Sequence, residues 1–460
     1  MNARHVAWNI LRDVDENDAY ANLVTPAALR QARLSRSDAG FVTELVYGTL
    51  RMRGLYDAVI AAAAGRDTTD IEPAVLDVLR MGAHQWLELH TPAHAAVSET
   101  VNLARSAHLA RTAGFVNAVM RRITERERDE WLDIVSHGAQ NEGDRLAVRY
   151  SHPRWVVDEL AEALTARGHG ADIEDLLTAD NTPAMVSLVD LAAARTSTSG
   201  GADVRPESWG DEIEPDVRSP FSLTLTSGDP GVIVKKSRGL VRVQDVGSQL
   251  AALALWDARE VLSNEAWLDV CAGPGGKAAL LAALAERSGA HLVANEMSEH
   301  RAELVRQALA PFANSSVSVS DGRAYAVSPE KFDRVLVDAP CSGLGALRRR
   351  PEARWRRTPE DVIELVALQE QLLAAACHVV APGGLLAYVT CTPSVSETTG
   401  VLDAVMSDRN DFTPVPVAPI IRRVTRGVIS PSDSDNCVQL WPHLDGTDAM
   451  FISLFVRSAK

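Results

Sequence analysis

The chain of 460 residues is long enough for two or three domains with cores of their own. Its 46% of hydrophobic residues makes it globular rather than disordered, and no run of about eighteen uncharged apolar residues predicts a membrane span. Charged residues interrupt the N-terminal stretch, where a signal peptide would need an apolar core. We therefore expect a cytoplasmic protein that does not enter a membrane.

The net charge of −15 does not exclude a nucleic-acid partner, because the acidic excess is local. Between Glu142 and Lys235 lie 17 acidic and 8 basic residues, whereas arginines cluster elsewhere, as in 348–357. Local clusters rather than the net charge decide whether phosphates are neutralised. Each cluster taken singly is also compatible with a solvated face.

The cysteines indicate a reducing compartment. They are Cys271, Cys341, Cys377, Cys391 and Cys437, an odd number without a CxxC pair or the spacing of a disulfide framework. Each is then either a small core residue or a reactive thiol. We predict no metal site.

Residues 1–137 are predicted to form an all-α domain. Apolar residues recur three or four positions apart, with short turns between, in the stretches 6–14, 39–52, 55–64, 73–89, 95–107 and 113–123. Arg121 and Arg122 end the last of these helices, where the macrodipole favours cations. A structural role and an RNA contact are therefore both open for this pair.

Residues 138–238 are predicted to form a small α/β linking domain. The stretch 149–164 indicates an amphipathic helix, and MVSLVDL (185–191) indicates a strand. A polar loop that contains glycine and proline follows at 196–215. The sequence predicts no chemistry for this domain.

Residues 239–460 are predicted to form a Rossmann-like α/β domain, because strands and helices alternate. A strand, turn and helix occupy 267–287, and strands at 334–338 and 385–389 flank the helix 360–380. The final strand, 451–457, is predicted as an antiparallel edge. The fold class is thus multidomain, with a helical domain followed by two α/β domains.

A glycine-rich turn joins the strand and the helix of 267–287. Gly273, Gly275 and Gly276 permit a ligand to approach the backbone and the amides of the helix closely. The next strand ends in Glu296, twenty residues after Gly276, where a carboxylate can accept hydrogen bonds from ribose hydroxyls. The pattern indicates a nucleoside-containing ligand.

Two ligand classes fit this turn, a dinucleotide and S-adenosylmethionine. The turn departs from GxGxxG, and Pro274 and Lys277 do not match a dinucleotide loop. Asp321, after a further short strand, suits an adenine amino group and a structural turn equally well.

Two cysteines follow strands of the same predicted sheet. Asp338 and Cys341 lie in the loop DAPCSG after one strand, and Cys391 follows another. The carboxyl ends of parallel strands meet at the edge where ligands bind. Each cysteine could equally be a buried residue at a strand exit, as we expect for Cys377 inside its helix.

A thiol pair beside a methyl donor has a specific use. Cytosine C5 becomes nucleophilic only after something adds to C6, and a thiolate is the side chain best suited to that addition. A second base must then remove the C5 proton so that the adduct can eliminate. A carboxylate such as Asp338 can hold the N3/N4 edge of a base that is single-stranded or flipped out. The residues alone do not order the two cysteines.

Three motifs in this order resemble the S-adenosylmethionine-dependent RNA 5-methylcytosine methyltransferases of the RsmB/NOP type. They are CAGPGGK (271–277), DAPCSG (338–343) and TCT (390–392), and RVQDVGSQ (242–249) and RRRPEARW (348–355) fit as well. The stretches ARHVAWNIL (3–11), LVYGTLR (45–51), HAAVSETVNLAR (94–105) and GFVNAVMRRI (114–123) resemble the NusB-type RNA-binding helical domain. Together the resemblances cover nearly the whole chain.

The resemblance implies an activity and partners. It implies transfer of a methyl group from S-adenosylmethionine to C5 of a cytosine in 16S ribosomal RNA, through a covalent adduct between a cysteine and C6. The RNA would be free or in an assembly intermediate, and the enzyme a monomer.

The resemblance also assigns roles. The nucleophile falls on Cys391, the cysteine that assists proton removal and release on Cys341, and the active-site aspartate, which also borders the cofactor, on Asp338. The cofactor loop falls on Cys271, Ala272, Gly273, Pro274, Gly275, Gly276 and Lys277, the ribose carboxylate on Glu296 and the adenine-side carboxylate on Asp321. The arginines expected to grip phosphates are Arg348, Arg349, Arg350 and Arg354.

The sequence departs from the family pattern at two places. Ser320 stands before Asp321 where the family usually has glycine, and MVSLVDL lacks an expected arginine–asparagine pair. The second departure, with the acidity of the middle domain, leaves the RNA contacts of that domain open.

Two alternatives from other classes remain. A nicotinamide-dependent oxidoreductase would use the same glycine turn, but it leaves both cysteines unexplained. An RNA-binding assembly factor on a degenerate enzyme fold would not need Cys341, Cys391 and Asp338, which are all intact. Binding of NADH would favour the oxidoreductase. Binding of RNA without binding of cofactor would favour the assembly factor.

Overall fold

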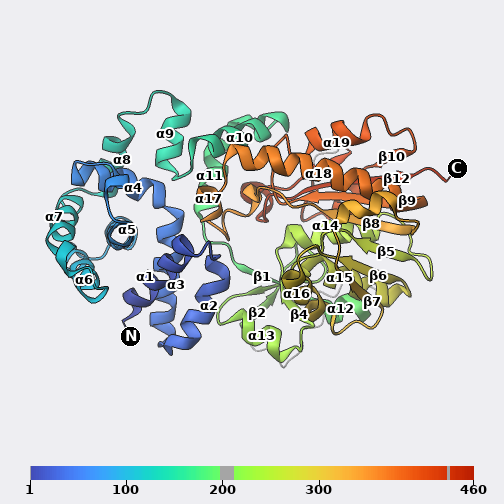
Figure 1. Cartoon of the computed structure of the whole chain (residues 1–460), viewed down its shortest axis with the longest axis horizontal. Coiled ribbons are helices and arrows are strands. Elements are labelled where there is room, and N and C mark those ends of the chain that lie inside the picture. The colour runs from blue at the N-terminus through green and yellow to red at the C-terminus, as the bar shows by residue number, and fades with distance from the viewer. Residues whose placement is uncertain (1, 197–211, 432–435, 460) are drawn as a thin grey trace. The chain divides into compact units, whose positions relative to one another are not determined.

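The computed structural model describes residues 2–196, 212–431 and 436–459. These residues form two compact units, each built from two stretches of the chain (Figure 1). The first, here called the helical unit, comprises Met1–Pro183 and Leu347–Arg356. The second, the sheet unit, comprises Ala184–Ala346 and Arg357–Lys460.

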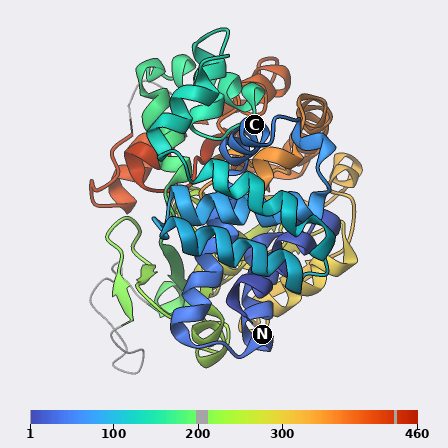
Figure 2. The same cartoon turned by 90° about the vertical axis from the view of Figure 1, so that its left-hand side faces the viewer.

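The helical unit is organised around one buried helix. Its α-helices are α1 (Ala3–Glu16), α2 (Ala21–Ala32), α3 (Arg36–Arg51), α4 (Arg53–Ala64), α5 (Pro73–Leu87), α6 (Ala93–Ser106), α7 (Ala113–Ile123), α8 (Arg128–Ser136), α9 (Glu142–Arg149), α10 (Arg154–Ala166), α11 (Ile173–Asn181) and α17 (Ala353–Arg356). Every residue from Val75 to Gln85 of α5 is buried, because α1, α3, α4, α6 and α7 pack around it (Figure 2). This helix forms the centre of the core.

The predicted helices of 1–137 are confirmed, but the sequence reading missed two. The helix α2 carries Pro26 and fully buries only Ala21 and Thr25, so its apolar face is weakly marked. The helix α8 is nine residues long and begins with a capping box between Glu127 and Glu130. Neither helix offers the long amphipathic stripe that identified the others.

A small antiparallel sheet opens the sheet unit. Its strands are β1 (Val186–Asp190), β2 (Ile213–Pro215), β3 (Ser222–Leu225) and β4 (Val241–Val243), in the order β2-β3-β1-β4. The short helices α12 (Leu191–Thr196) and α13 (Pro230–Lys236) connect them. The strand predicted in MVSLVDL is therefore confirmed as β1, whereas most of the predicted loop 196–215 lies outside the described residues.

The large sheet carries five adjacent parallel strands. Its strands are β5 (Ala266–Asp269), β6 (His291–Asn295), β7 (Ser315–Ser318), β8 (Phe332–Asp338), β9 (Val380–Thr390), β10 (Phe412–Val415), β11 (Cys437–Gln439) and β12 (Phe451–Arg457). The order is β10-β12-β9-β8-β5-β6-β7, with β11 also paired to β12. The pairs from β9 to β7 are all parallel, and β12 runs antiparallel to β9. The final strand is thus antiparallel, as expected, but it is not an edge, because β10 pairs with its other side.

Different helices cover the two faces of this sheet (Figure 1). The helices α14 (Val246–Asp257), α15 (Gly276–Ser288), α16 (Glu299–Leu309) and α20 (Ala418–Val424) pack on one face, and α18 (Pro359–Val379) and α19 (Thr399–Met406) pack on the other. By length and composition α18 could cross a membrane. Its buried residues, among them Leu372 and Leu373, pack against Val335 and Val337 of β8 instead, so it is a core helix of the sheet.

The compact units group the middle of the chain differently from the sequence reading. Residues 138–183 belong to the helical unit and 184–238 to the sheet unit. The predicted limits at 137/138 and 238/239 describe a finer, three-domain division that stays a prediction.

The segment 347–356 leaves the sheet unit shortly after Cys341 and packs within the helical unit. Arg354, 0% exposed, donates hydrogen bonds to the carbonyl of Ser151 at 3.1 Å and to Oδ1 of Asn181 at 2.9 Å. Glu352 accepts one from the backbone N–H of Ala21 at 3.1 Å. Buried hydrogen bonds of a charged side chain hold the segment in this unit.

Candidate active site

The predicted site residues follow five neighbouring strands. In the order β9, β8, β5, β6 and β7, the strands are succeeded by Cys391, by Asp338 and Cys341, by the turn 271–277, by Glu296 and by Asp321. Because these strands are parallel, their carboxyl ends share one edge of the sheet. The fold therefore brings together at this edge what the sequence spreads over 121 positions, from Cys271 to Cys391.

The two strand-end thiols touch. The Sγ atoms of Cys341 and Cys391 lie 3.4 Å apart, within hydrogen-bond distance for sulfur. The hydrogen bond to Cys391, together with burial, raises the pKa of the Cys341 thiol well above its usual value. The raised pKa favours the protonated form of Cys341.

The backbone fixes the distance between the two thiol loops. The N–H of Ala339 donates to the carbonyl of Val389, and the N–H of Gly345 donates to the carbonyl of Cys391, both at 2.9 Å. A Cβ atom on Gly345 would lie 2.8 Å from that carbonyl oxygen and 2.1 Å from the carbonyl oxygen of Ala449. Only glycine permits this close approach.

Glu397, 0% exposed, joins the two loops from behind. Its carboxylate accepts hydrogen bonds from the backbone N–H of Ser342 at 2.8 Å, from the Ser342 hydroxyl at 2.5 Å and from the amide of Gln369 at 3.0 Å. The Ser342 hydroxyl also lies 3.0 Å from the hydroxyl of Thr392. Each cysteine is therefore next to a residue of one buried network, which sets the position of both loops.

Lys277 reaches from the glycine turn to the neighbouring loop. Its Nζ lies 2.9 Å from Oδ1 of Asp338. Burial disfavours the ammonium, but the negative charge of Asp338 outweighs burial and raises the pKa of Lys277. The pair places a fixed positive charge and a carboxylate beside the two thiols.

Asp269, at the end of β5, is a further carboxyl group behind this pair. Burial and the nearby charge of Asp338 raise the pKa of Asp269 to about 8. Its Oδ1 accepts the N–H of Cys271 at 3.3 Å, and among the described residues its Oδ2 has no hydrogen-bond partner. An unpartnered buried carboxyl oxygen at a ligand-binding edge is available for a hydrogen bond with a ligand.

The glycine turn and Glu296 fit together. The N–H of Gly273 donates to Oε2 of Glu296 at 3.1 Å, and the N–H of Ser298 donates to Oε1 at 3.0 Å. A Cβ atom on Gly273 would lie 2.2 Å from Oε2, and Gly275 has a φ of +101°. The glycines thus allow a carboxylate to lie against the turn, as a ribose-binding site requires.

Asp321 lies on the same edge but is already partnered. Its carboxylate forms hydrogen bonds with Arg323, the shortest at 2.6 Å, and these lower the pKa of Asp321. Its side chain is partly exposed. It also accepts the N–H of Arg323 at the start of a short helix, so the structural turn that we weighed is present.

The other cysteines lie apart from this chemistry. Burial raises the pKa of Cys377 to about 11, and its sulfur packs 3.7 Å from that of Met406. Burial likewise raises the pKa of Cys271, beside Asp269. Both remain thiols at neutral pH and are not nucleophiles.

The prediction that Arg354 binds RNA is wrong, because its side chain is fully buried and donates to groups within the helical unit. Arg350 is exposed, with its guanidinium 5.5 Å from the centre of the Tyr20 ring. Arg348 and Arg349 are half-buried and have partners of their own. An RNA role for these three stays a prediction.

The sequence reading missed the roles of Asp269 and Glu397. Asp269 ends a strand two positions before Cys271 of the motif 271–277, which is a detectable signal. Glu397 stands six positions after Cys391, but nothing in the local sequence shows that its carboxylate turns back to Ser342 of another loop. Lys277 was assigned to the cofactor loop alone, and its ion pair with Asp338 depends on the adjacency of β5 and β8.

Fold and site together define an α/β enzyme with a nucleoside-type cofactor turn and a thiol pair at one sheet edge. Residues 258–456 match the family "16S rRNA methyltransferase RsmB/F", and residues 1–125 match the NusB family. The chain is 32% identical to ribosomal RNA small subunit methyltransferase B of Thermus thermophilus, over 92% of each chain. It is 44% identical to Rv1407 of Mycobacterium tuberculosis, over 99% of this chain and 96% of that one. The chain belongs to the RsmB/F family of 16S rRNA methyltransferases.

Solved structures agree on the fold. The crystal structure of PH0851 has a TM-score of 0.78 at 22% identity, and it covers 99% of this chain and 97% of that chain. The structure of NSun6 from Pyrococcus horikoshii with SFG has a TM-score of 0.50 at 18% identity, over 66% and 98%. The enzyme is therefore an S-adenosylmethionine-dependent rRNA methyltransferase with a NusB-type helical region, and the nicotinamide alternative is set aside.

Proposed function

We propose that this enzyme methylates C5 of a cytosine in 16S ribosomal RNA through a covalent adduct between Cys391 and C6. The observation that carries the proposal is the contact between Cys341 and Cys391, 3.4 Å apart, beside the ion pair of Lys277 and Asp338. Methylation of a ribose hydroxyl or an exocyclic amine needs no second thiol. Addition to C6 followed by elimination uses both.

The raised pKa of the Cys341 thiol is consistent with Cys391 as the attacking cysteine and Cys341 as the assisting one. Cys391 gives an electron pair to C6, forming the S–C6 bond, and C5 becomes nucleophilic. Cys341 keeps its proton at this stage because its pKa is raised. Once C5 carries the methyl group, loss of the C5 proton lets the C5–C6 double bond re-form and the S–C6 bond break. Cys341, 3.4 Å from the departing sulfur, passes its proton to Cys391, and the Cys341 thiolate that results takes the C5 proton.

Asp338 and Lys277 hold the base and its charge. The carboxylate of Asp338 can accept a hydrogen bond from the N4 amino group of the base. The ammonium of Lys277, 2.9 Å from Asp338, fixes that carboxylate and stabilises negative charge that develops on the ring. Both side chains come from turns at strand ends, so little reorganisation is needed when the base enters.

The cofactor fits the remaining side of the edge. Residues 271–277 and Glu296 would hold S-adenosylmethionine at the glycine turn, with Asp321 on the adenine side once Arg323 shifts. The unpartnered Oδ2 of buried Asp269 is placed to form a hydrogen bond with a ligand at the turn. When bound, the cofactor supplies the methyl group as an electrophile.

The test is methyl transfer to defined RNA. Purified enzyme, labelled S-adenosylmethionine and unmodified 16S RNA made in vitro should give label in 5-methylcytosine, located at one position by bisulfite sequencing. The reaction should be repeated with a small-subunit assembly intermediate. Label found only in another base, or on ribose, would contradict the proposal.

Further expectations belong to the same proposal. The enzyme acts in the cytoplasm as a monomer without a membrane anchor, and Arg348, Arg349 and Arg350 contact phosphates near the flipped cytosine. The chain divides functionally into an RNA-binding region 1–137, a linking region 138–238 and a catalytic region 239–460.

A further inference from the structure

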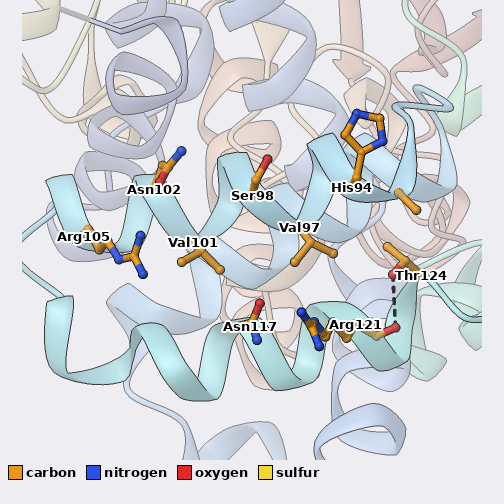
Figure 3. Close-up of a pocket in the computed structure, with 10 residues that line it drawn as sticks. His94, Val97, Ser98, Val101, Asn102, Arg105, Asn117, Arg121 and Thr124 are labelled. Carbon is orange, nitrogen blue, oxygen red and sulfur yellow. Dashed lines mark hydrogen bonds between the residues drawn. The ribbon is translucent and has the colours of Figure 1, made fainter.

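A groove on the helical unit has the chemistry of a second RNA site. It lies between α6 and α7 and encloses about 500 Å³ (Figure 3). Its ten lining residues are Ala93, His94, Val97, Ser98, Val101, Asn102, Arg105, Asn117, Arg121 and Thr124. None of these described residues is acidic, and the proposed active site uses none of them.

Two arginines stand at opposite ends of the groove. Figure 3 shows Arg105 at one end, Arg121 at the other and Val97 and Val101 between them. Both arginines are exposed, and within the described parts of the chain neither guanidinium has a hydrogen-bond or ion-pair partner. They are therefore available to an anionic ligand.

The arginine pair that the sequence left open is divided by the structure. Arg122 donates from Nη1 to the carbonyl of Ala63 at 2.8 Å, which is a structural role. Arg121, one position earlier, turns toward the groove instead (Figure 3). Glu99, the acidic residue on α6, lies 3.3 Å from Arg4 and does not line the groove. The positive charge of the groove is thus not cancelled nearby.

The rest of the lining suits nucleobases. Asn117 points from α7 toward α6 (Figure 3), and its amide can both donate to and accept from the edge of a base. Val97 and Val101 of α6 form an apolar wall beside it. From His94 to Arg105 the helix rises roughly 16 Å, at about 1.5 Å per residue. A stacked strand advances about 3.4 Å per nucleotide, so this length matches about five nucleotides.

We propose that the α6–α7 groove binds a single-stranded segment of the substrate RNA, with Arg105 and Arg121 on phosphates and Asn117 on a base edge. This inference rests on the proposed function for the identity of the RNA, but it concerns a site separate from the chemistry. An acidic protein segment is the competing occupant. It would need a larger apolar surface than two valines and would leave the Asn117 amide without a base edge to read.

The experiment compares two pairs of substitutions in the full-length protein. Arg105→Gln with Arg121→Gln removes both groove charges. Arg33→Gln with Arg111→Gln removes two exposed charges of the same unit that do not line the groove. All four side chains are exposed, so both proteins should melt as the unsubstituted enzyme does. Binding of unmodified 16S RNA is measured without cofactor between 0.1 M and 0.5 M salt.

Loss of two phosphate contacts should reduce the salt slope of log affinity by about 1.4, since each contributes about 0.7 on a single strand. At 0.1 M salt this amounts to binding about 25-fold weaker for the groove variant, with the control variant within about twofold of the unsubstituted enzyme. Equal affinity and salt slope for the two variants would overturn the proposal. So would a groove variant that loses binding to polyglutamate but not to RNA.

Methyl transfer by the unsubstituted enzyme separates this inference from the proposed function. If that enzyme methylates 16S RNA while the groove variant binds RNA normally, the groove assignment alone fails. If the groove variant binds RNA poorly while the unsubstituted enzyme places no methyl group on cytosine C5, the assigned chemistry fails and the RNA site stands.

Discussion

The two thiol loops of the sheet unit begin alike and differ in what surrounds the sulfur. Both follow adjacent parallel strands, and each has a proline next to its cysteine or two positions beyond it. The Cys341 loop is fastened to buried Glu397 through Ser342 and keeps its thiol protonated. Cys391 is positioned by its own carbonyl, which accepts from Gly345. The Cys341 loop thus keeps its thiol protonated, and the Cys391 loop is held mainly by its backbone. The local sequences do not show this difference.

Replacing Cys391 should have the largest effect. Cys391→Ala removes the atom that adds to C6, so methyl transfer to 16S RNA should fall by at least about a thousandfold. Binding of S-adenosylmethionine, measured by calorimetry, should stay within about threefold. Cys437→Ala is a matched control that should keep full activity. If Cys391→Ala retains methylation, Cys391 is not the nucleophile and the proposed roles of the two loops are wrong.

Replacing Cys341 should have a different effect rather than a smaller version of the same one. Cys341→Ala leaves the nucleophile but removes the proton-holding partner, so turnover should fall about a hundredfold and a covalent enzyme–RNA adduct should accumulate. Denaturing gels with labelled RNA detect this adduct. A double variant with Cys391→Ala should not form it. Intact turnover without adduct would remove the release role from Cys341.

Replacing Glu397, which accepts hydrogen bonds from Ser342, should have an intermediate effect. Glu397→Gln loses the carboxylate that accepts both donors of Ser342, so both sulfurs gain freedom. We expect kcat to fall about tenfold with the KM for S-adenosylmethionine unchanged, and the pH profile of kcat to shift as the proton on Cys341 is held less firmly. Glu364→Gln, on the exposed face of α18, is the control. An unchanged pH profile would leave Glu397 a purely structural role.

The smallest effect concerns Asp269, the buried carboxyl group at the end of β5. The pKa of Asp269 is raised to about 8, so between about pH 4 and pH 8 the folded enzyme keeps a proton that the unfolded chain has released. Stability should therefore fall as pH rises through this window. Asp269→Asn lacks this dependence, and its Tm should change less between pH 5 and pH 8, by at least about 3 °C. Asp403→Asn, an exposed control, should show the same change in Tm as the unsubstituted enzyme. If Asp269→Asn also shows that change, Asp269 does not hold the proton.

The sequence predicted the elements of the sheet edge well and their mutual contacts poorly. Apolar runs that end in proline or glycine place Asp338 and Cys341 after one strand, and parallel sheets have one ligand-binding edge, so the meeting of the motifs was predictable. The pairing of Lys277 with Asp338 was not, because it depends on β8 lying next to β5. The turn of Glu397 toward Ser342 likewise depends on the packing of two loops.

Arginines show the same limit more plainly. The run that contains Arg354 looked like a phosphate-binding cluster, yet Arg354 is buried. Arg105 and Arg121, sixteen positions apart, instead line the same groove. Clustering in sequence measures nearness along the chain, and a charged patch depends on which helix faces lie side by side. Helical period alone cannot say which face of α7 remains uncovered.

The segment 347–356 affects how this enzyme can be taken apart. Because the chain passes between the units at 183/184, 346/347 and 356/357, a proteolytic cut at 183/184 leaves the segment 347–356 of the helical unit bonded to the sheet unit. A fragment that ends at residue 183 would lack Arg354 and leave the carbonyls of Ser151 and Asp180 without the donor that they have in the intact chain. Transfer of the helical unit between relatives must therefore carry this ten-residue loop of the enzyme with it, so the two units are inherited and engineered as a pair.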